Sequence, residues 1–288
     1  MSAVYAAVPE KLTTPWKKGG QYGFDRSLLH KLIGVQVAGG SAMNAPSGGL
    51  ALAVDVWLAT ELRRAGIRPG AVWPREDRPR VLPQGLSGAV EAFSFSRTAA
   101  TRAIQEQTIA RLSERTGSNQ SNIMGGYFRK EIDVVMADWD RGLELGISSK
   151  TMTGSAAKNV GNRFEEAAGD LANIRRRYPM AAFGYAYLVT RNVVEDEPAA
   201  WERIKDMLRK LTSLSTNDES ASYDATCLIV AHWPQGQVAL DEDSVPEDLS
   251  PDVFLERMLR RLFSRSPVSE HGDARELWTA SAPTDIEP

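Results

Sequence analysis

Hydrophobic residues in the middle of the chain follow two different spacings. In 132–136 and again in 143–148 they stand two apart, on either side of a turn at 138–142 (DWDRG), which predicts two strands joined by a short hairpin. In 159–177 the apolar residues form a stripe at helical spacing, and Pro179 ends that predicted helix. Mostly apolar segments then predict buried strands, at 180–190 and 223–231.

The rest of the chain supplies helices that would cover this sheet. Helices are predicted near 28–32 and over 50–65, 96–116, 201–211 and 252–263. Loops are expected at 67–86 and 118–126, and a polar, irregular chain after Pro267. The order strand, turn, strand, helix, strand predicts an α/β (α+β layered) fold, with a central mixed sheet flanked by helices. We expect an N-terminal region (1–94) packed on a core (95–266), followed by a flexible tail (267–288).

Composition narrows the possible chemistry. With 34 Lys and Arg against 37 Asp and Glu, the net charge is −3, so nucleic-acid binding would need a local basic patch. The single cysteine, Cys227, excludes an intrachain disulfide and a zinc site with several cysteines, and only three histidines are present. Metal chemistry would therefore depend on carboxylates. Neither a signal peptide nor an apolar stretch of about 18 residues is visible, so a cytoplasmic protein is expected.

Residues with chemical potential gather around the predicted hairpin. Asp133 lies on its first strand, and Ser148 and Lys150 lie on the second, where residues two apart share a face. The following helix can return Glu165 or Glu166 over the strand end. Two carboxylates, a lysine and a serine suit a Mg²⁺ site, with Lys150 orienting the attacking water. Glu144 shares the predicted face of Lys150 and is the rival metal ligand.

Ile132-Asp133 followed by Ser148-Ser149-Lys150 resembles the signature of the PD-(D/E)xK nuclease superfamily. Ile132 stands where the motif has proline, and Ser148 where it has an acidic residue. One branch of restriction endonucleases has serine there, with the metal-binding glutamate moved to the next helix. Glu165 and Glu166, fifteen and sixteen residues after Lys150, are close to that pattern. The segment 158–170 (KNVGNRFEEAAGD) is also similar to a helix of the XhoI-like restriction enzymes.

The resemblance implies a Mg²⁺-dependent endonuclease that cleaves double-stranded DNA as a homodimer, like a type II restriction enzyme. It implies catalytic roles for Asp133, Ser148, Lys150 and Glu165 or Glu166, with metal held by Asp133 and one of the glutamates. Because Ser148 replaces an acidic residue, the alternative is a catalytically inactive DNA-binding or protein-interaction module on the same fold. A repair or recombination nuclease without sequence specificity is a third interpretation.

Two segments carry candidate DNA contacts. The segment 118–130 (SNQSNIMGGYFRK) combines amides, glycines, an aromatic pair and basic residues, and such amides and arginines can bind base edges. The simpler interpretation is a polar loop followed by a solvated helix face. The candidate residues are Asn119, Gln120, Asn122, Arg129 and Lys130, with Lys158, Asn159, Asn162 and Arg163 on the next helix.

Overall fold

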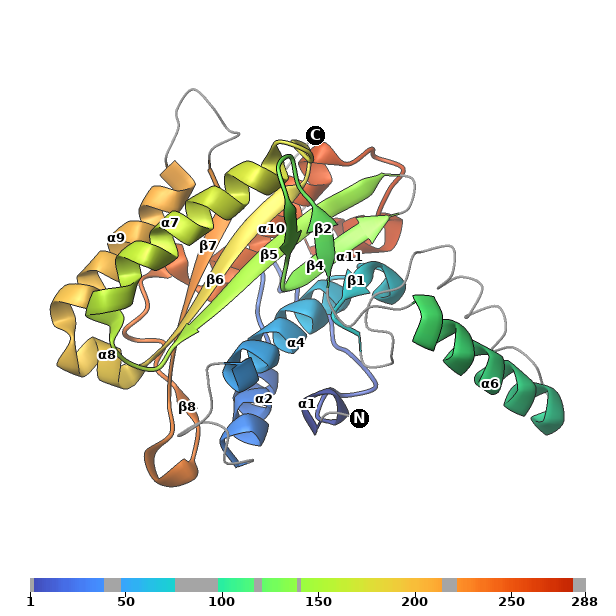
Figure 1. Cartoon of the computed structure of the whole chain (residues 1–288), viewed down its shortest axis with the longest axis horizontal. Helices are drawn as coiled ribbons and strands as arrows, with labels where there is room; N and C mark the ends of the chain where they lie inside the picture. Colours follow the sequence, from blue (N-terminus) through green and yellow to red (C-terminus); the bar gives the residue numbers. More distant parts are fainter. Residues whose placement is uncertain are drawn as a thin grey trace.

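The structure is a computed structural model, and it describes residues 3–38, 48–75, 98–116, 121–138, 141–213 and 222–281. Its described strands form a six-stranded mixed sheet in the order β1-β4-β5-β6-β7-β8 (Figure 1). The three central strands are parallel, whereas β1, β4 and β8 run antiparallel to their neighbours. The strands are β1 (Val72–Trp73), β4 (Val134–Asp138), β5 (Gly142–Met152), β6 (Ala182–Thr190), β7 (Ala225–His232) and β8 (Ala239–Leu240).

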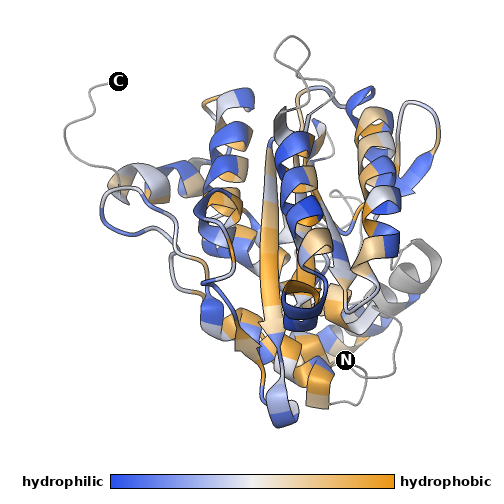
Figure 2. Cartoon of the chain, turned by 90° about the vertical axis from the view of Figure 1, so that its left-hand side faces the viewer, coloured by the Kyte–Doolittle hydropathy of each residue, from blue (hydrophilic) through white to orange (hydrophobic). Residues whose placement is uncertain are grey.

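Helices cover both faces of this sheet, which confirms the predicted α/β architecture (Figure 1). α4 and α10 pack on one face, with α2 against α4, and α7 and α9 pack on the other. Figure 2 shows hydrophobic residues on the strands and on the inner helix sides, and hydrophilic residues outside. The described helices are α1 (Ala3–Ala6), α2 (Arg26–Ala38), α4 (Gly48–Arg64), α6 (Ala99–Thr116), α7 (Ala156–Arg175), α8 (Arg191–Asp196), α9 (Pro198–Ser213), α10 (Pro251–Arg265) and α11 (Gly272–Ser281).

The central strands are buried on both sides, and this explains their composition. Every residue of β6 is buried, and β7 is buried except at its end. A parallel strand covered by helices on both faces is expected to be continuously apolar. On the α10 side the packing is close, because a Cβ atom added to Gly184 would lie 2.7 Å from the ring of Phe254.

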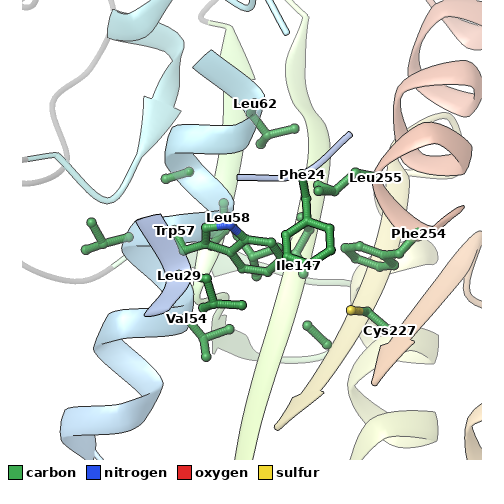
Figure 3. Packing of buried hydrophobic residues seen from close by; sticks show 14 of the residues in the cluster. Phe24, Leu29, Val54, Trp57, Leu58, Leu62, Ile147, Cys227, Phe254 and Leu255 are labelled. Carbon is green, nitrogen blue, oxygen red and sulfur yellow. The ribbon is translucent and has the colours of Figure 1, made fainter. Parts of the chain in front are cut away.

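The core on the α4 and α10 side joins segments far apart in the sequence. The rings of Phe24 and Trp57 meet edge to face with centroids 5.8 Å apart, and Phe254 and Cys227 lie on the other side of Ile147 (Figure 3). Because the N-terminal segment contributes Phe24 to this cluster, it is part of the same core as the sheet.

Several short elements lie where the sequence predicted loops. β1 lies within the predicted loop 67–86, and β2 (Asn122–Met124) pairs with β3 (Arg129–Glu131) in a separate hairpin. The prediction of an irregular chain after Pro267 is wrong for α11, because Trp278 stacks on Phe263 with centroids 5.5 Å apart. The predicted boundary between residues 94 and 95 lies outside the described residues. No helix among the described residues has both the length and the apolar character needed to cross a bilayer.

Candidate functional site

Asp133 occupies a bend immediately before β4, next to the second half of β5. Val134, the first residue of β4, pairs antiparallel with Ile147, and this pairing places Asp133 alongside the second half of β5. The Asp133 carboxylate accepts a hydrogen bond from the backbone N–H of Ser149, with Oδ2 and N 2.8 Å apart. The structure therefore places Asp133 beside the residue that precedes Lys150.

A second carboxylate reaches the same serine from the helix layer. Asp55 lies on α4, and its Oδ1 accepts a hydrogen bond from the Ser149 hydroxyl. Asp55 is not among the site residues predicted from the sequence. The signal that could have found it is a single acidic residue within the apolar run 50–58, on a helix whose neighbouring residues are buried.

Burial and neighbouring charges perturb both aspartates. Burial and the charge of Asp133 raise the pKa of Asp55 well above its usual value, against the lowering effect of the Ser149 hydroxyl and Lys150. Burial also raises the pKa of Asp133, although the Ser149 N–H and Lys150 act in the opposite direction. Neighbouring like charges in a partly desolvated site favour protonation or a bound cation.

Lys150 lies on β5 and is held from the α7 side. Its Nζ atom is 3.1 Å from Oε1 of Glu166, whose other oxygen is 2.7 Å from the guanidinium of Arg163. Burial alone would raise the pKa of Glu166, but the bonds from Arg163 and Lys150 outweigh it and the pKa is lowered. Glu165 is exposed, so the structure separates the two glutamates: Glu166 contacts Lys150.

Glu144 does not lie with Lys150. The register of β4 and β5 shifts here, because Met136 pairs with Leu145 and Ala137 pairs with Leu143, so Glu144 has no partner across the strands. Its carboxylate binds Arg141 at 2.9 Å and the His271 ring at 3.2 Å. Six residues of strand, about 20 Å, separate it from Lys150. The expected shared face is thus wrong, because period-two alternation does not continue through a bulge.

Ser148 and Ser149 have different surroundings. Ser148 pairs with Tyr185, whose ring belongs to the cluster under α7. Ser149 has the opposite orientation and bonds both aspartates. The serine that bonds the aspartates is therefore Ser149, and the supporting role of Ser148 stays a prediction.

A cavity of about 320 Å³ adjoins the two aspartates. Asp55, Glu131 and Asp133 contribute to its wall together with Trp73 and Pro74. A larger cavity of about 520 Å³ lies between α10 and the start of β7, with three arginines in its wall. That larger cavity has one carboxylate, Asp224, which is already bound by arginines, so the paired acidic groups favour the smaller cavity as the candidate site.

The candidate DNA-contacting residues occupy two neighbouring elements. Asn122 and Arg129 are exposed on the β2-β3 hairpin, and Lys158 and Asn162 are exposed on α7. The remaining three described candidates are less exposed: Lys130 contacts Asp170 at 2.6 Å, Asn159 donates to the Ser155 carbonyl, and Arg163 binds Glu166. Asn119 and Gln120 lie outside the described residues.

Comparisons of the chain with family models, with curated proteins and with solved structures find no match. Whether a metal ion fits the candidate site depends on the side chains that could bind it. No group of three or more His, Cys, Asp or Glu side chains in the described residues has metal-binding geometry. Mg²⁺, however, is commonly held by one or two carboxylates and keeps several waters, so the pair Asp55 and Asp133 fits this ion.

Proposed function

We propose that this chain is a Mg²⁺-dependent endonuclease that hydrolyses phosphodiester bonds of double-stranded DNA. The observation that supports it is the convergence of Asp55 and Asp133 on Ser149, directly before Lys150. Two carboxylates with raised pKa values create a site for a hard cation, and the positive charge of Lys150, on the α7 side of β5, acts on both of them. The resemblance of these strands to the PD-(D/E)xK signature supports the same activity.

In this proposal each side chain has a separate task. Asp55 and Asp133 would hold the ion, so Asp55 would take the place that the sequence suggested for a glutamate. An ion held there would supply Lewis-acid chemistry, polarising a phosphoryl oxygen and lowering the pKa of a coordinated water. Lys150 orients the attacking water and stabilises the negative charge that develops on the phosphate. Glu166 keeps the lysine ammonium in position through their 3.1 Å contact.

Digestion of a long, unmodified DNA with Mg²⁺ tests the activity, and sequencing of the ends gives the cleavage site. We expect Asp133→Asn and Lys150→Ala to lower the cleavage rate by about 10²-fold or more, as loss of a key electrostatic contact does. Glu165→Gln is the matched control, because Glu165 is exposed beside Glu166, and it should cleave normally.

Metal binding is measured separately by calorimetric titration with Mg²⁺. Asp55→Asn and Asp133→Asn should weaken binding, whereas Lys150→Ala should retain it, because only the aspartates supply ligands. Equal Mg²⁺ affinity in wild type and Asp55→Asn would remove Asp55 from the proposed site.

The alternative of a catalytically inactive DNA-binding or protein-interaction module has one supporting feature. Ser148 provides no carboxylate on the Lys150 strand, and Lys150 is already paired with Glu166. Wild-type protein that binds DNA but leaves it intact with Mg²⁺ would favour this module. Discrete fragments would support a homodimer at a symmetric site, whereas a smear would indicate a nuclease without sequence specificity.

A further inference from the structure

The tip of the β2-β3 hairpin exposes two aromatic rings. Tyr127 is 64% exposed and Phe128 is 52% exposed, and Met124 on β2 is 42% exposed. The hairpin stands beside the C-terminal end of α7 (Figure 1). Rings that contribute so little to the core need another explanation for their place on the surface.

The backbone of this tip is fixed by one buried side chain from α7. Asn173 is 1% exposed, and its Oδ1 accepts hydrogen bonds from the N–H groups of Tyr127 and Phe128, at 2.9 and 3.2 Å. Its Nδ2 donates to the Phe128 carbonyl at 3.0 Å, and its own carbonyl accepts from Gly126 N at 2.7 Å. A Cβ atom on Gly125 would lie 2.4 Å from the Asn173 amide, so this clamp requires glycine there. The structure therefore orders the tip while leaving both rings exposed.

Positive charges surround the rings. The Arg176 guanidinium lies 5.1 Å from the centroid of the Tyr127 ring and donates to its hydroxyl at 3.2 Å. Arg129 and Arg177 are also exposed, and none of these three arginines pairs with a carboxylate of the described residues. Such a positively charged surface is complementary to a polyanion, and less so to a protein surface with few acidic residues.

The hairpin is joined to the candidate active site. The N–H of Ile132 donates to the Ser121 carbonyl, and the Ser121 hydroxyl donates to the Ile132 carbonyl. Lys130 contacts both Asp170 and Glu166, and Glu166 also binds Lys150. Five residues separate Phe128 from Asp133, a span of at most about 17 Å, which is about five base pairs along a duplex.

We propose that the Tyr127 and Phe128 tip inserts into a groove of duplex DNA and unstacks a base step near the cleaved phosphate. The substrate in this inference rests on the proposed function. Apolar wedges beside arginines are known to unstack base steps in this way, and the cost is recovered by the additional surface that the deformed duplex contacts. Arg129, Arg176 and Arg177 would bind the phosphates on either side of the wedge.

Fluorescence of 2-aminopurine tests the insertion, because this base brightens when it is unstacked. Full-length protein is mixed in EDTA with duplexes that carry 2-aminopurine at successive positions around the cleavage site, or in mixed-sequence DNA if no cleavage is found. With wild-type protein, 2-aminopurine fluorescence should increase at one position of the duplex or at a few adjacent ones. Phe128→Ala should abolish most of this increase and weaken binding by about tenfold, the effect expected for one lost base–aromatic contact.

Three further variants separate insertion from surface hydrophobicity. Phe128→Leu should retain most of the signal, since leucine is also a wedge. Val268→Ala removes an 87% exposed apolar side chain outside the hairpin and should change nothing. Asn173→Ala keeps both rings but releases the clamp, so the signal should fall while circular dichroism shows a folded protein.

The outcomes distinguish this inference from the nuclease proposal. If wild type cleaves DNA but no position brightens, or if Phe128→Ala behaves like Val268→Ala, the wedge is disproved and the nuclease stands. If bases brighten but Mg²⁺ never produces cleavage, the wedge stands and the nuclease fails. If Phe128→Ala instead converts a dimer to a monomer in sedimentation and leaves DNA binding unchanged, the tip binds a second copy and the proposal is overturned.

Discussion

At the residue scale, two aspartates from distant parts of the sequence share the hydrogen-bond donors of one serine. Ser149 gives its N–H to Asp133 and its hydroxyl to Asp55. A serine has no further proton to donate, so these bonds do not cancel the repulsion between the carboxylates. Burial raises the pKa of both groups, and the charge of Asp133 raises the pKa of Asp55 further.

Burial of these two carboxylates, with the added repulsion at Asp55, predicts a stability that depends on pH and on Mg²⁺. A carboxylate whose pKa is raised by folding contributes stability below its unfolded pKa and loses it as the pH rises through the folded value. The metal-free wild type should therefore be destabilised by the pair at neutral pH, and Mg²⁺ should restore stability by binding the folded state. Asp55→Asn should raise the melting temperature in EDTA by about 2–4 °C, the shift for about 1 kcal/mol, and should lose the response to Mg²⁺.

Melting curves at about pH 5 and about pH 8, with and without Mg²⁺, measure both effects as a difference between wild type and variant. Asp248→Asn is the control with the opposite sign, because the bond from Arg209 lowers the pKa of Asp248. It should destabilise the protein slightly, by less than about 1 kcal/mol for a surface pair. An Asp55→Asn protein with a lower melting temperature than wild type in EDTA would show that the Asp55 carboxylate does not destabilise the metal-free protein.

The same residues show what the sequence could and could not predict at this site. Strand alternation and the return of the next helix were enough to bring Asp133, Lys150 and Glu166 to one region. Asp55 is marked in the sequence only as a lone acidic residue in an apolar run, and its contact with Ser149 could not be predicted because it crosses from the helix layer to the sheet. Glu144 was misplaced because one bulge reverses the face of all residues beyond it.

At the element scale, α4 joins the site to the N-terminal segment through a second buried carboxylate. Glu61 is fully buried and accepts hydrogen bonds from the Tyr22 hydroxyl at 2.9 Å, the Asp25 N–H at 2.8 Å and the Trp57 indole at 3.0 Å. It also pairs with Arg64 at 2.6 Å. Burial raises the pKa of Glu61 even with these partners, so the helix depends on keeping all of them.

We therefore expect Glu61→Ala to be strongly destabilising. Removal of one member of a buried pair leaves the Arg64 charge without its partner, which costs about 3–5 kcal/mol. Urea denaturation followed by circular dichroism measures this change. Glu242→Ala is the matched control, since the Arg26 pair it removes is nearly half exposed, and it should cost less than about 1 kcal/mol. A similar loss of unfolding free energy in both variants would show that the buried Glu61 network stabilises the protein no more than a surface ion pair does.

Long elements were predictable from the sequence, and short ones were not. β6, β7, α9 and α10 have enough residues to display a period, and all four lie close to their predicted positions. β1 and β2 have two and three residues, which is too few for any periodicity. α11 was missed because it is mostly polar and is held by a few large contacts rather than by a continuous apolar stripe.

At the scale of the whole molecule, the two ends of the described chain meet over the α4 and α10 side. The Trp278 ring stacks near Phe263 and lies 6.2 Å from the Trp16 ring. The Gly19 N–H donates to the Ser281 carbonyl at 2.8 Å. Gly66 has a φ of +91° and lies so close to α11 that an added Cβ would be 2.9 Å from Ala274. Residues at both ends of the chain thus stabilise the face that carries Asp55.

Trp278→Ala tests whether the contact between α11 and the N-terminal segment unfolds in the same cooperative transition as the sheet. Loss of the aromatic contacts of a partly buried tryptophan should cost about 2 kcal/mol. Because α11 contacts α10 and the N-terminal segment, tryptophan fluorescence and circular dichroism should still report one coincident urea transition, at a lower midpoint. Val268→Ala, in the exposed chain before α11, should leave the midpoint unchanged. Two separated transitions in Trp278→Ala would show that the ends fold apart from the sheet, and that the α4 face is held by its own core alone.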